Sequence, residues 1–152
     1  MSLNRKSGRS ADSGPPIGSE LSAMPPHSKV IGESLLSDSE TTKVLLFVSM
    51  HCTHCIDLLP HIDAMTQRNP SFSFQLISTG DEEDNRSMVE YFGWEFPVCS
   101  LDQGDMEAYF AVTYLPFMIL VDESGKVTAK GVVYNADEFE QIVKDYVRHA
   151  SA

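Results

Sequence analysis

A continuous apolar run, Val44–Val48, is followed four residues later by the first of two closely spaced cysteines, Cys52 and Cys55. Such a run is typical of a parallel strand whose two faces are both covered. Apolar residues then recur at three- and four-residue spacing until Asn69-Pro70, which predicts a helix. This order of strand, cysteine loop and helix constrains the fold most, because it requires a sheet with helices packed on it.

The cysteines sit where a helix start can activate sulfur. The positive end of the helix dipole and the unpaired backbone N–H groups favour the thiolate of Cys52. One turn later, Cys55 is placed to attack a disulfide formed by Cys52. We therefore expect Cys52 to be the nucleophile and Cys55 the resolving thiol. Two buried structural cysteines, or half of a zinc site, are the alternatives, and only His51 and His54 are close enough to complete a zinc site.

The first forty residues have a different composition from the rest. Residues 1–40 contain ten Ser, four Pro, four Gly and no aromatic residue, too little apolar surface to offset the entropy of ordering. We expect a flexible tether over 1–40 and one domain over 41–152. The basic residues Arg5, Lys6 and Arg9 fit either the flank of a removed membrane segment or a solvated tail.

Charge and hydropathy narrow the functional classes. The chain of 152 residues carries 22 acidic and 11 basic side chains, a net charge of -11. Nucleic acids are bound mainly by neutralising phosphates, so this charge argues against a nucleic-acid partner. No apolar run approaches the roughly 18 residues of a membrane span. We expect membrane contact only through a removed N-terminal anchor, and we expect no cofactor and no bound metal.

The remaining patterns predict an α/β fold. The predicted elements are strands at Phe72–Ser78 and Phe96–Ser100, helices at Asp81–Phe92 and Asp105–Phe110, a hairpin of Phe117–Asp122 and Val127–Val133, and a final helix after Asn135. Strand–helix pairs followed by a hairpin and a helix predict a mixed sheet with helices on both faces. The acidic run 81–84 is explained by the dipole of the helix it begins. Cys99, on a short strand, is expected to be a buried apolar residue.

Two prolines extend the pattern. Pro60 lies five residues after Cys55, and Tyr114-Leu115-Pro116 directly precedes a predicted strand. With the C-x-x-C motif and the final hairpin and helix, these positions resemble the thioredoxin superfamily over about residues 43–147. The resemblance implies that Pro60 kinks the helix and that the Leu115–Pro116 bond is cis. It also implies that Leu115 and Pro116 bind an extended segment of a protein substrate.

The segment before the cis-proline loop holds an extra strand and helix compared with a minimal thioredoxin. Phe96-Pro97-Val98 and the turn 122–126 resemble the TlpA and ResA group of extracytoplasmic, often membrane-anchored oxidoreductases. The stretch 14–18 is similar to methylamine-dehydrogenase maturation proteins of that group. The resemblance implies protein disulfides or dithiols as substrates and an upstream redox partner protein. It also implies an extracytoplasmic location, periplasmic or membrane-anchored, although a cytoplasmic location stays open.

The chain also departs from the family pattern. Met50-His51 replaces the usual tryptophan before the first cysteine, and Leu46 stands where thioredoxin has a buried acid. Thr53-His54 replaces Gly-Pro between the cysteines. A histidine before the second cysteine recurs in the more oxidising relatives, which implies redox-tuning roles for His51, Thr53 and His54.

A metal-delivery module is one competing function. The two cysteines and two histidines of the motif offer sulfur and imidazole donors that suit copper or zinc. Copper carriers on the thioredoxin fold use C-x-x-x-C with a remote histidine, so the two-residue spacing here argues against this function.

A peroxiredoxin-like peroxidase is the other competing function. Ser49 fits the Thr/Ser position of the peroxiredoxin motif, but Leu45 stands where its proline is required. Cys55 is also too close to Cys52 for the usual distant resolving thiol.

Overall fold

The computed structural model describes the backbone of residues 13–21, 29–31 and 41–151. Within these ranges, strands form one mixed sheet in the order β1-β4-β3-β2-β5-β6. The strands are β1 (Lys29–Ile31), β2 (Thr42–Val48), β3 (Phe72–Ser78), β4 (Val98–Ser100), β5 (Phe117–Val121) and β6 (Val127–Val132). The helices are α2 (Thr53–Leu58), the 3-10 helix η1 (Leu59–His61), α3 (Ile62–Arg68), α4 (Glu82–Phe92), α5 (Gln103–Phe110) and α6 (Ala136–Ser151).

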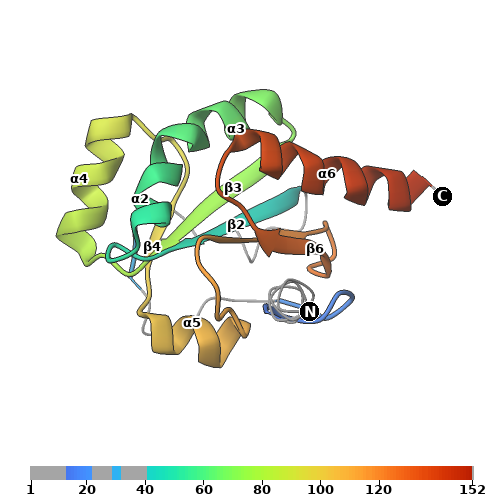
Figure 1. The fold of residues 1–152 in the computed structure, drawn as a ribbon, viewed down its shortest axis with the longest axis horizontal. Coiled ribbons are helices and arrows are strands. Elements are labelled where there is room, and N and C mark those ends of the chain that lie inside the picture. The colour runs from blue at the N-terminus through green and yellow to red at the C-terminus, as the bar shows by residue number, and fades with distance from the viewer. Residues whose placement is uncertain (1–12, 22–28, 32–40, 152) are drawn as a thin grey trace, which may run out of the picture.

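The strand that leads to the cysteines is central in the sheet. β2 is buried from its second residue to its last, as the continuous apolar run predicts. It lies parallel to β3 and antiparallel to β5, and β3 lies parallel to β4. β5 and β6 form the predicted antiparallel hairpin. The mixed sheet expected from the sequence is therefore confirmed (Figure 1).

Each face of the sheet is covered by helices. Because side chains alternate along a strand, Val44, Leu46 and Val48 face one core and Leu45 and Phe47 the other. The first core includes buried residues of α2, α3 and α6, and the second includes residues of α5. Figure 1 shows α3 and α6 on one side of the sheet and α5 on the other. The prediction of helices on both faces is confirmed.

Pro60 interrupts the helix that follows the cysteines. α2 ends at Leu58, the 3-10 segment η1 contains Pro60, and α3 begins at Ile62. Proline has no N–H and its ring clashes with the preceding turn, so regular α-helix cannot continue through it. The buried side chains on both sides of the break belong to the same core; they are Cys55, Leu58, Ile62 and Met65. The predicted kink is confirmed, and it keeps one apolar face against the sheet.

Capping residues set three helix starts. The Asp84 N–H donates to Asp81 Oδ1 at 2.8 Å and the Asp81 N–H donates to Asp84 Oδ2 at 3.3 Å, which makes a capping box before α4. Asp102 and Asn135 accept in the same way before α5 and α6. The acidic run at the start of α4 therefore has a structural role, and α4 begins one residue later than predicted because Asp81 is its cap.

Strand β4 is shorter than the predicted strand Phe96–Ser100. Pro97 lacks an N–H for the ladder, although its carbonyl accepts the Leu76 N–H at 3.1 Å. The hairpin strands end one residue earlier than predicted. At the first of these ends, Asp122 Oδ1 accepts the N–H groups of Ser124 and Lys126 at 2.9 and 3.0 Å and so begins the turn.

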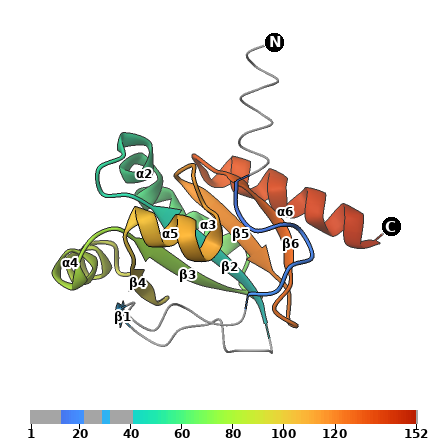
Figure 2. The same ribbon diagram turned by 90° about the horizontal axis from the view of Figure 1, so that it is seen from below.

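Two parts of the segment predicted as a tether are hydrogen-bonded to the domain (Figure 2). β1, which the composition did not indicate, pairs antiparallel with β4, and residues 13–21 bond to the β5–β6 hairpin and to the loop after α5. Backbone pairing needs no apolar side chains, so the low apolar content did not prevent it. The tether prediction does not hold for these residues, and the rest of it lies outside the described residues.

Candidate active site

The loop between β2 and α2 is held by hydrogen bonds within the loop and to the residue that follows β3. The Met50 N–H donates to Thr79 Oγ1 at 2.8 Å, directly after β3. The His51 N–H donates to Ser49 Oγ at 3.1 Å, and the Cys52 N–H donates to the Ser49 carbonyl at 3.2 Å. Ser49 is itself buried. The sequence did not single out Ser49 or Thr79 for this task, and together they fix where Cys52 emerges.

Cys52 is the N-cap of α2. Its backbone is extended, with φ -108° and ψ 118°, and its sulfur accepts the Cys55 N–H at 3.4 Å. The sulfur thus occupies the place that a serine or aspartate oxygen usually takes at a helix start. A negative charge there is stabilised by the N–H group and by the helix dipole. The side chain is partly exposed, so a partner can reach the sulfur, and the predicted place of Cys52 at the helix start is confirmed.

Cys55 differs from Cys52 in its exposure to solvent. Its side chain is 0% exposed and lies in the same apolar core as Leu46. Burial raises the pKa of the Cys55 thiol from 9.0 to about 12, and the neighbouring Cys52 adds to the rise while a backbone contact with Ser49 lowers it. Cys55 is therefore protonated at neutral pH. The pair consists of one accessible sulfur at a helix start and one buried thiol.

The loop before β5 faces the same sulfur. The Leu115–Pro116 bond is cis, as the resemblance implies. The Cys52 thiol donates to the Leu115 carbonyl with an S···O distance of 3.9 Å. The Val133 N–H donates to the Pro116 carbonyl at 3.3 Å, which ties this loop to the end of the hairpin. The structure thus brings Leu115 and Pro116 to the C-x-x-C motif.

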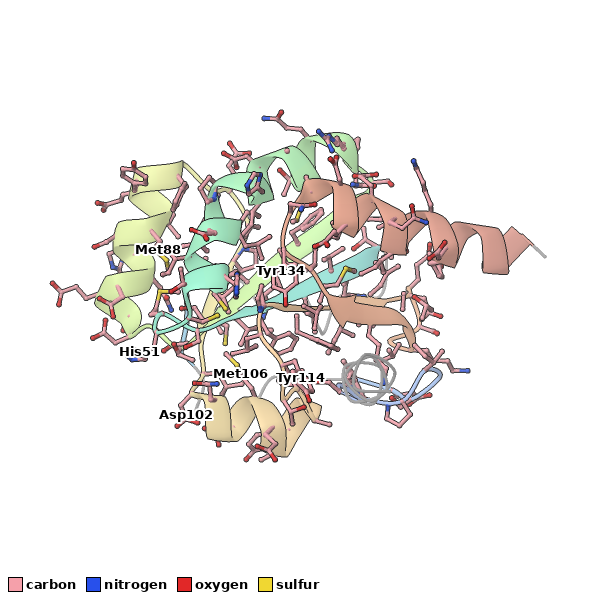
Figure 3. All side chains as sticks on the ribbon, in the orientation of Figure 1. His51, Met88, Asp102, Met106, Tyr114 and Tyr134 are labelled. Carbon is pink, nitrogen blue, oxygen red and sulfur yellow. The ribbon has the colours of Figure 1, made fainter. Side chains whose placement is uncertain are left out.

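Three predicted tuning residues lie at the surface of the motif. His51, Thr53 and His54 are all exposed. The His54 ring packs edge-on against Tyr134, with ring centroids 5.2 Å apart. His51 lies in the loop before α2 and Tyr134 in the loop between β6 and α6 (Figure 3). Sequence reasoning missed Tyr134, because no spacing pattern relates it to the cysteines.

Cys99 lies apart from the pair. It is 0% exposed and belongs to the core on the face of the sheet opposite to Cys55. Its burial confirms the expectation that Cys99 is a buried residue on a short strand. In the described part of the chain, no group of three or more His, Cys, Asp or Glu side chains is arranged to hold a metal ion.

Solved structures of oxidoreductases share this architecture. The thioredoxin domain of a thiol-disulfide oxidoreductase from Bacteroides vulgatus matches with a TM-score of 0.63 at 21% identity, over 86% of this chain and 98% of that one. StoA from Bacillus subtilis matches with a TM-score of 0.59 at 15% identity, over 78% of this chain and 98% of that one. A secreted Mycobacterium tuberculosis disulfide oxidoreductase homologous to E. coli DsbE matches with a TM-score of 0.58 at 20% identity, over 71% of this chain and 83% of that one. The chain has a thioredoxin fold. No protein-family model and no curated protein sequence matches it.

One departure from thioredoxin itself now has a structural meaning. Leu46, at the position of thioredoxin's buried acid, is 0% exposed and lies in the same core as Cys55. An apolar side chain at this position cannot accept a proton from the Cys55 thiol. In this thioredoxin fold the surroundings of Cys55 therefore favour the neutral thiol, consistent with its raised pKa.

The raised pKa of Cys55 predicts a pH dependence of stability in the reduced protein. The thiol ionises near 9.0 in the unfolded chain and at about 12 in the fold. The stabilisation of the fold by the neutral thiol is complete below the unfolded-state pKa. It is lost as the pH rises toward the folded-state pKa, because the folded state then binds more protons than the unfolded state. Between about pH 8 and about pH 10 we expect the free energy of unfolding to fall by about 1.4 kcal/mol, as measured by urea denaturation. Cys55→Ser is the control, and an equal loss in that variant would contradict the assignment.

Proposed function

We propose that this protein is a thiol–disulfide oxidoreductase that exchanges disulfides with partner proteins through Cys52 and Cys55. The observation that carries the proposal is the asymmetry of the pair, one sulfur capping a helix within reach of a partner and the other buried and protonated. This asymmetry suits a nucleophile and a resolving thiol. The similar solved structures are described as oxidoreductases of this kind, which supports the same reaction class.

The reaction balances with two electrons. The Cys52 thiolate attacks one sulfur of a partner disulfide, forms a mixed disulfide and releases the other sulfur as a thiolate. The Cys55 thiol then loses its proton to that leaving sulfur or to solvent and attacks the Cys52 sulfur. The Cys52–Cys55 disulfide forms, the partner leaves as a dithiol, and the reverse sequence oxidises a partner.

Leu115 and Pro116 are proposed to bind the substrate segment. The Leu115 carbonyl points to the Cys52 sulfur at 3.9 Å, so its backbone lies beside the reacting atom. Pro116 has no N–H, so it makes no competing donation at this position. An extended partner segment can add to this backbone as a strand does, which would hold its disulfide in line with Cys52.

A redox titration of Cys52 and Cys55, combined with insulin reduction, tests the proposal. We expect one two-electron couple that is lost in Cys52→Ser, and a potential between about -270 mV and about -120 mV. A value near the first limit indicates a reductant, and a value near the second an oxidant. The proposal fails if the two sulfurs form no disulfide across this range of potentials or if reduced protein leaves insulin intact.

We also propose an extracytoplasmic site of action and an upstream redox partner protein. The support is the resemblance to the TlpA and ResA group and the similarity to a secreted mycobacterial oxidoreductase. No helix in the described ranges is long and apolar enough to cross a membrane. Thiol labelling of intact cells with a membrane-impermeant reagent tests the location, and Cys52 that is labelled only after lysis would contradict it.

His54 is proposed to tune the couple. It lies in the first turn of α2, two residues after Cys52, and a protonated imidazole there favours the thiolate and so the reduced form. We expect His54→Gln to lower the reduction potential by about 30 mV, equivalent to about 1.4 kcal/mol for two electrons. The matched control is His61→Gln, an exposed histidine in η1. An unchanged or higher potential in His54→Gln would mean that the ring does not act on the sulfur.

A further inference from the structure

Residues 13–21 run across the outside of the domain alongside the β5–β6 hairpin (Figure 2). One end is fixed to the hairpin by three backbone hydrogen bonds. The Gly18 N–H donates to the Val127 carbonyl at 2.7 Å, the Val127 N–H donates to the Ser19 carbonyl at 2.8 Å, and the Leu21 N–H donates to the Gly125 carbonyl at 2.7 Å. Pairing of this kind fixes the segment to a rigid part of the sheet.

The other end reaches the loop that carries Leu115. The Gly14 N–H donates to the Ala111 carbonyl at 2.7 Å. The side chain of Ser13 is 2% exposed, and its oxygen accepts the Thr113 N–H at 2.9 Å and lies 3.1 Å from the Thr113 hydroxyl. Thr113 is two residues before Leu115. The segment therefore holds the loop immediately before the residues that face Cys52.

Gly14 fits this place because it has no side chain. Its φ is +82°, which disfavours a residue with a Cβ atom. A Cβ built there would lie 2.7 Å from Cε2 of Phe117, a buried residue at the start of β5. The Gly14 carbonyl also accepts from Lys130 Nζ at 3.4 Å. The close approach lets the backbone of the segment bond directly to the loop.

In the loop between α5 and β5, Val112 is buried, but Ala111 and Thr113 on either side of it are exposed. Ala111, the C-cap that follows α5, has a φ of 57°, in the left-handed region that a side chain disfavours. Beyond it, Thr113 is exposed and so lacks the packing of a core residue. Among the hydrogen bonds described for residues 13–21, those that reach residues 111–113 come from Ser13 and Gly14.

We propose that Ser13 and Gly14 are positioning residues that hold the cis-proline loop against Cys52 for exchange with protein disulfides. The inference rests on the proposed oxidoreductase function. The path runs from Ser13 to Thr113, along the chain to Leu115, and from the Leu115 carbonyl to the Cys52 sulfur. A protein disulfide that pairs with the Leu115 backbone needs this geometry. A small disulfide needs only the partly exposed sulfur of Cys52.

We call the contacts of Ser13 and Gly14 with the loop after α5 the clamp. Ser13→Ala tests the clamp directly. It removes the oxygen that accepts the Thr113 N–H and leaves the backbone bonds of the segment in place. We expect kcat/KM for insulin reduction to fall about tenfold, mainly through KM, because misplacing a binding group weakens positioning. Single-turnover reaction with a small aromatic disulfide should stay within about twofold of wild type.

Ser19→Ala is the matched control. It is the same substitution in the same segment, and the Ser19 hydroxyl donates to the Pro16 carbonyl, at 2.6 Å, within the segment itself. We expect both substrates to react as with wild type. Gly14→Ala is the second clamp variant, and its Cβ should push the segment from Phe117 and lower insulin reduction at least as much as Ser13→Ala. If Gly14→Ala does not fold, Ser13→Ala alone decides.

The outcomes separate the clamp from the proposed function. A wild-type protein that reacts with neither disulfide contradicts the oxidoreductase function. A wild-type protein that reacts with both, with Ser13→Ala unchanged or slowed equally for both substrates, overturns the clamp and leaves that function standing. A lower melting temperature with an unchanged preference between the substrates would also overturn it, because that pattern is the mark of a purely structural contact.

Discussion

Replacing Cys55 by serine is expected to stop the exchange at the mixed disulfide. The accessible Cys52 sulfur remains at the helix start, where it still attacks a partner disulfide. The hydroxyl that replaces the buried thiol cannot attack sulfur, so the partner stays bound to Cys52. Multiple turnover of insulin should fall about a hundredfold or more, because the second half of the reaction is lost. Non-reducing electrophoresis and mass spectrometry of the adduct measure the trapped complex.

Two controls define what the trapped complex means. Cys52→Ser in the same background should give no adduct, since the remaining thiol, Cys99, is buried on the opposite face of the sheet. Cys99→Ala alone should exchange as wild type does. An adduct on Cys99, or full turnover by Cys55→Ser, would contradict the assignment of nucleophile and resolving thiol.

The active loop could be predicted because its determinants are local. An apolar run, two cysteines and Pro60 lie within seventeen consecutive residues of the sequence, from 44 to 60. Strand burial, helix capping and the break at proline depend on residues close along the chain. The place of Cys52 at the helix start follows from these neighbours, and the kink at Pro60 was implied by the family resemblance.

Other features of the site could not be predicted, because only the fold creates them. The contact of His54 with Tyr134 joins the first turn of α2 to the loop before α6, which is far away in the sequence. The attachment of residues 13–21 and the pairing of β1 depend on backbone groups, which every residue carries whatever its side chain. Composition therefore indicated a tether where backbone bonding holds the chain. The cis-proline loop was found in advance only through the family resemblance.

Phe47→Ala is expected to have the largest effect on stability. Phe47 is 0% exposed in the central strand, five residues before Cys52, and lies opposite Phe117 in the register of β2 and β5. Its ring meets the ring of Phe110 in α5 edge-on, with centroids 5.1 Å apart. Truncating a buried phenylalanine costs about 3 to 5 kcal/mol through lost burial and the cavity that remains. Urea denaturation of the reduced protein measures the loss as a lower midpoint.

The matched control for Phe47→Ala is Tyr91→Ala, since Tyr91 is 83% exposed and should change stability by no more than about 0.5 kcal/mol. The cavity would open beside Phe110, the last residue of α5, directly before the loop that leads to Leu115. Where the variant still folds, insulin reduction should therefore slow more than reaction with a small disulfide. The reason is that Phe110, directly before the loop, loses its packing on Phe47. If Phe47→Ala lowers the free energy of unfolding by less than about 1 kcal/mol, α5 is not packed on the central strand as described. A normal preference for insulin in a strongly destabilised variant would show instead that the position of the loop does not depend on this core.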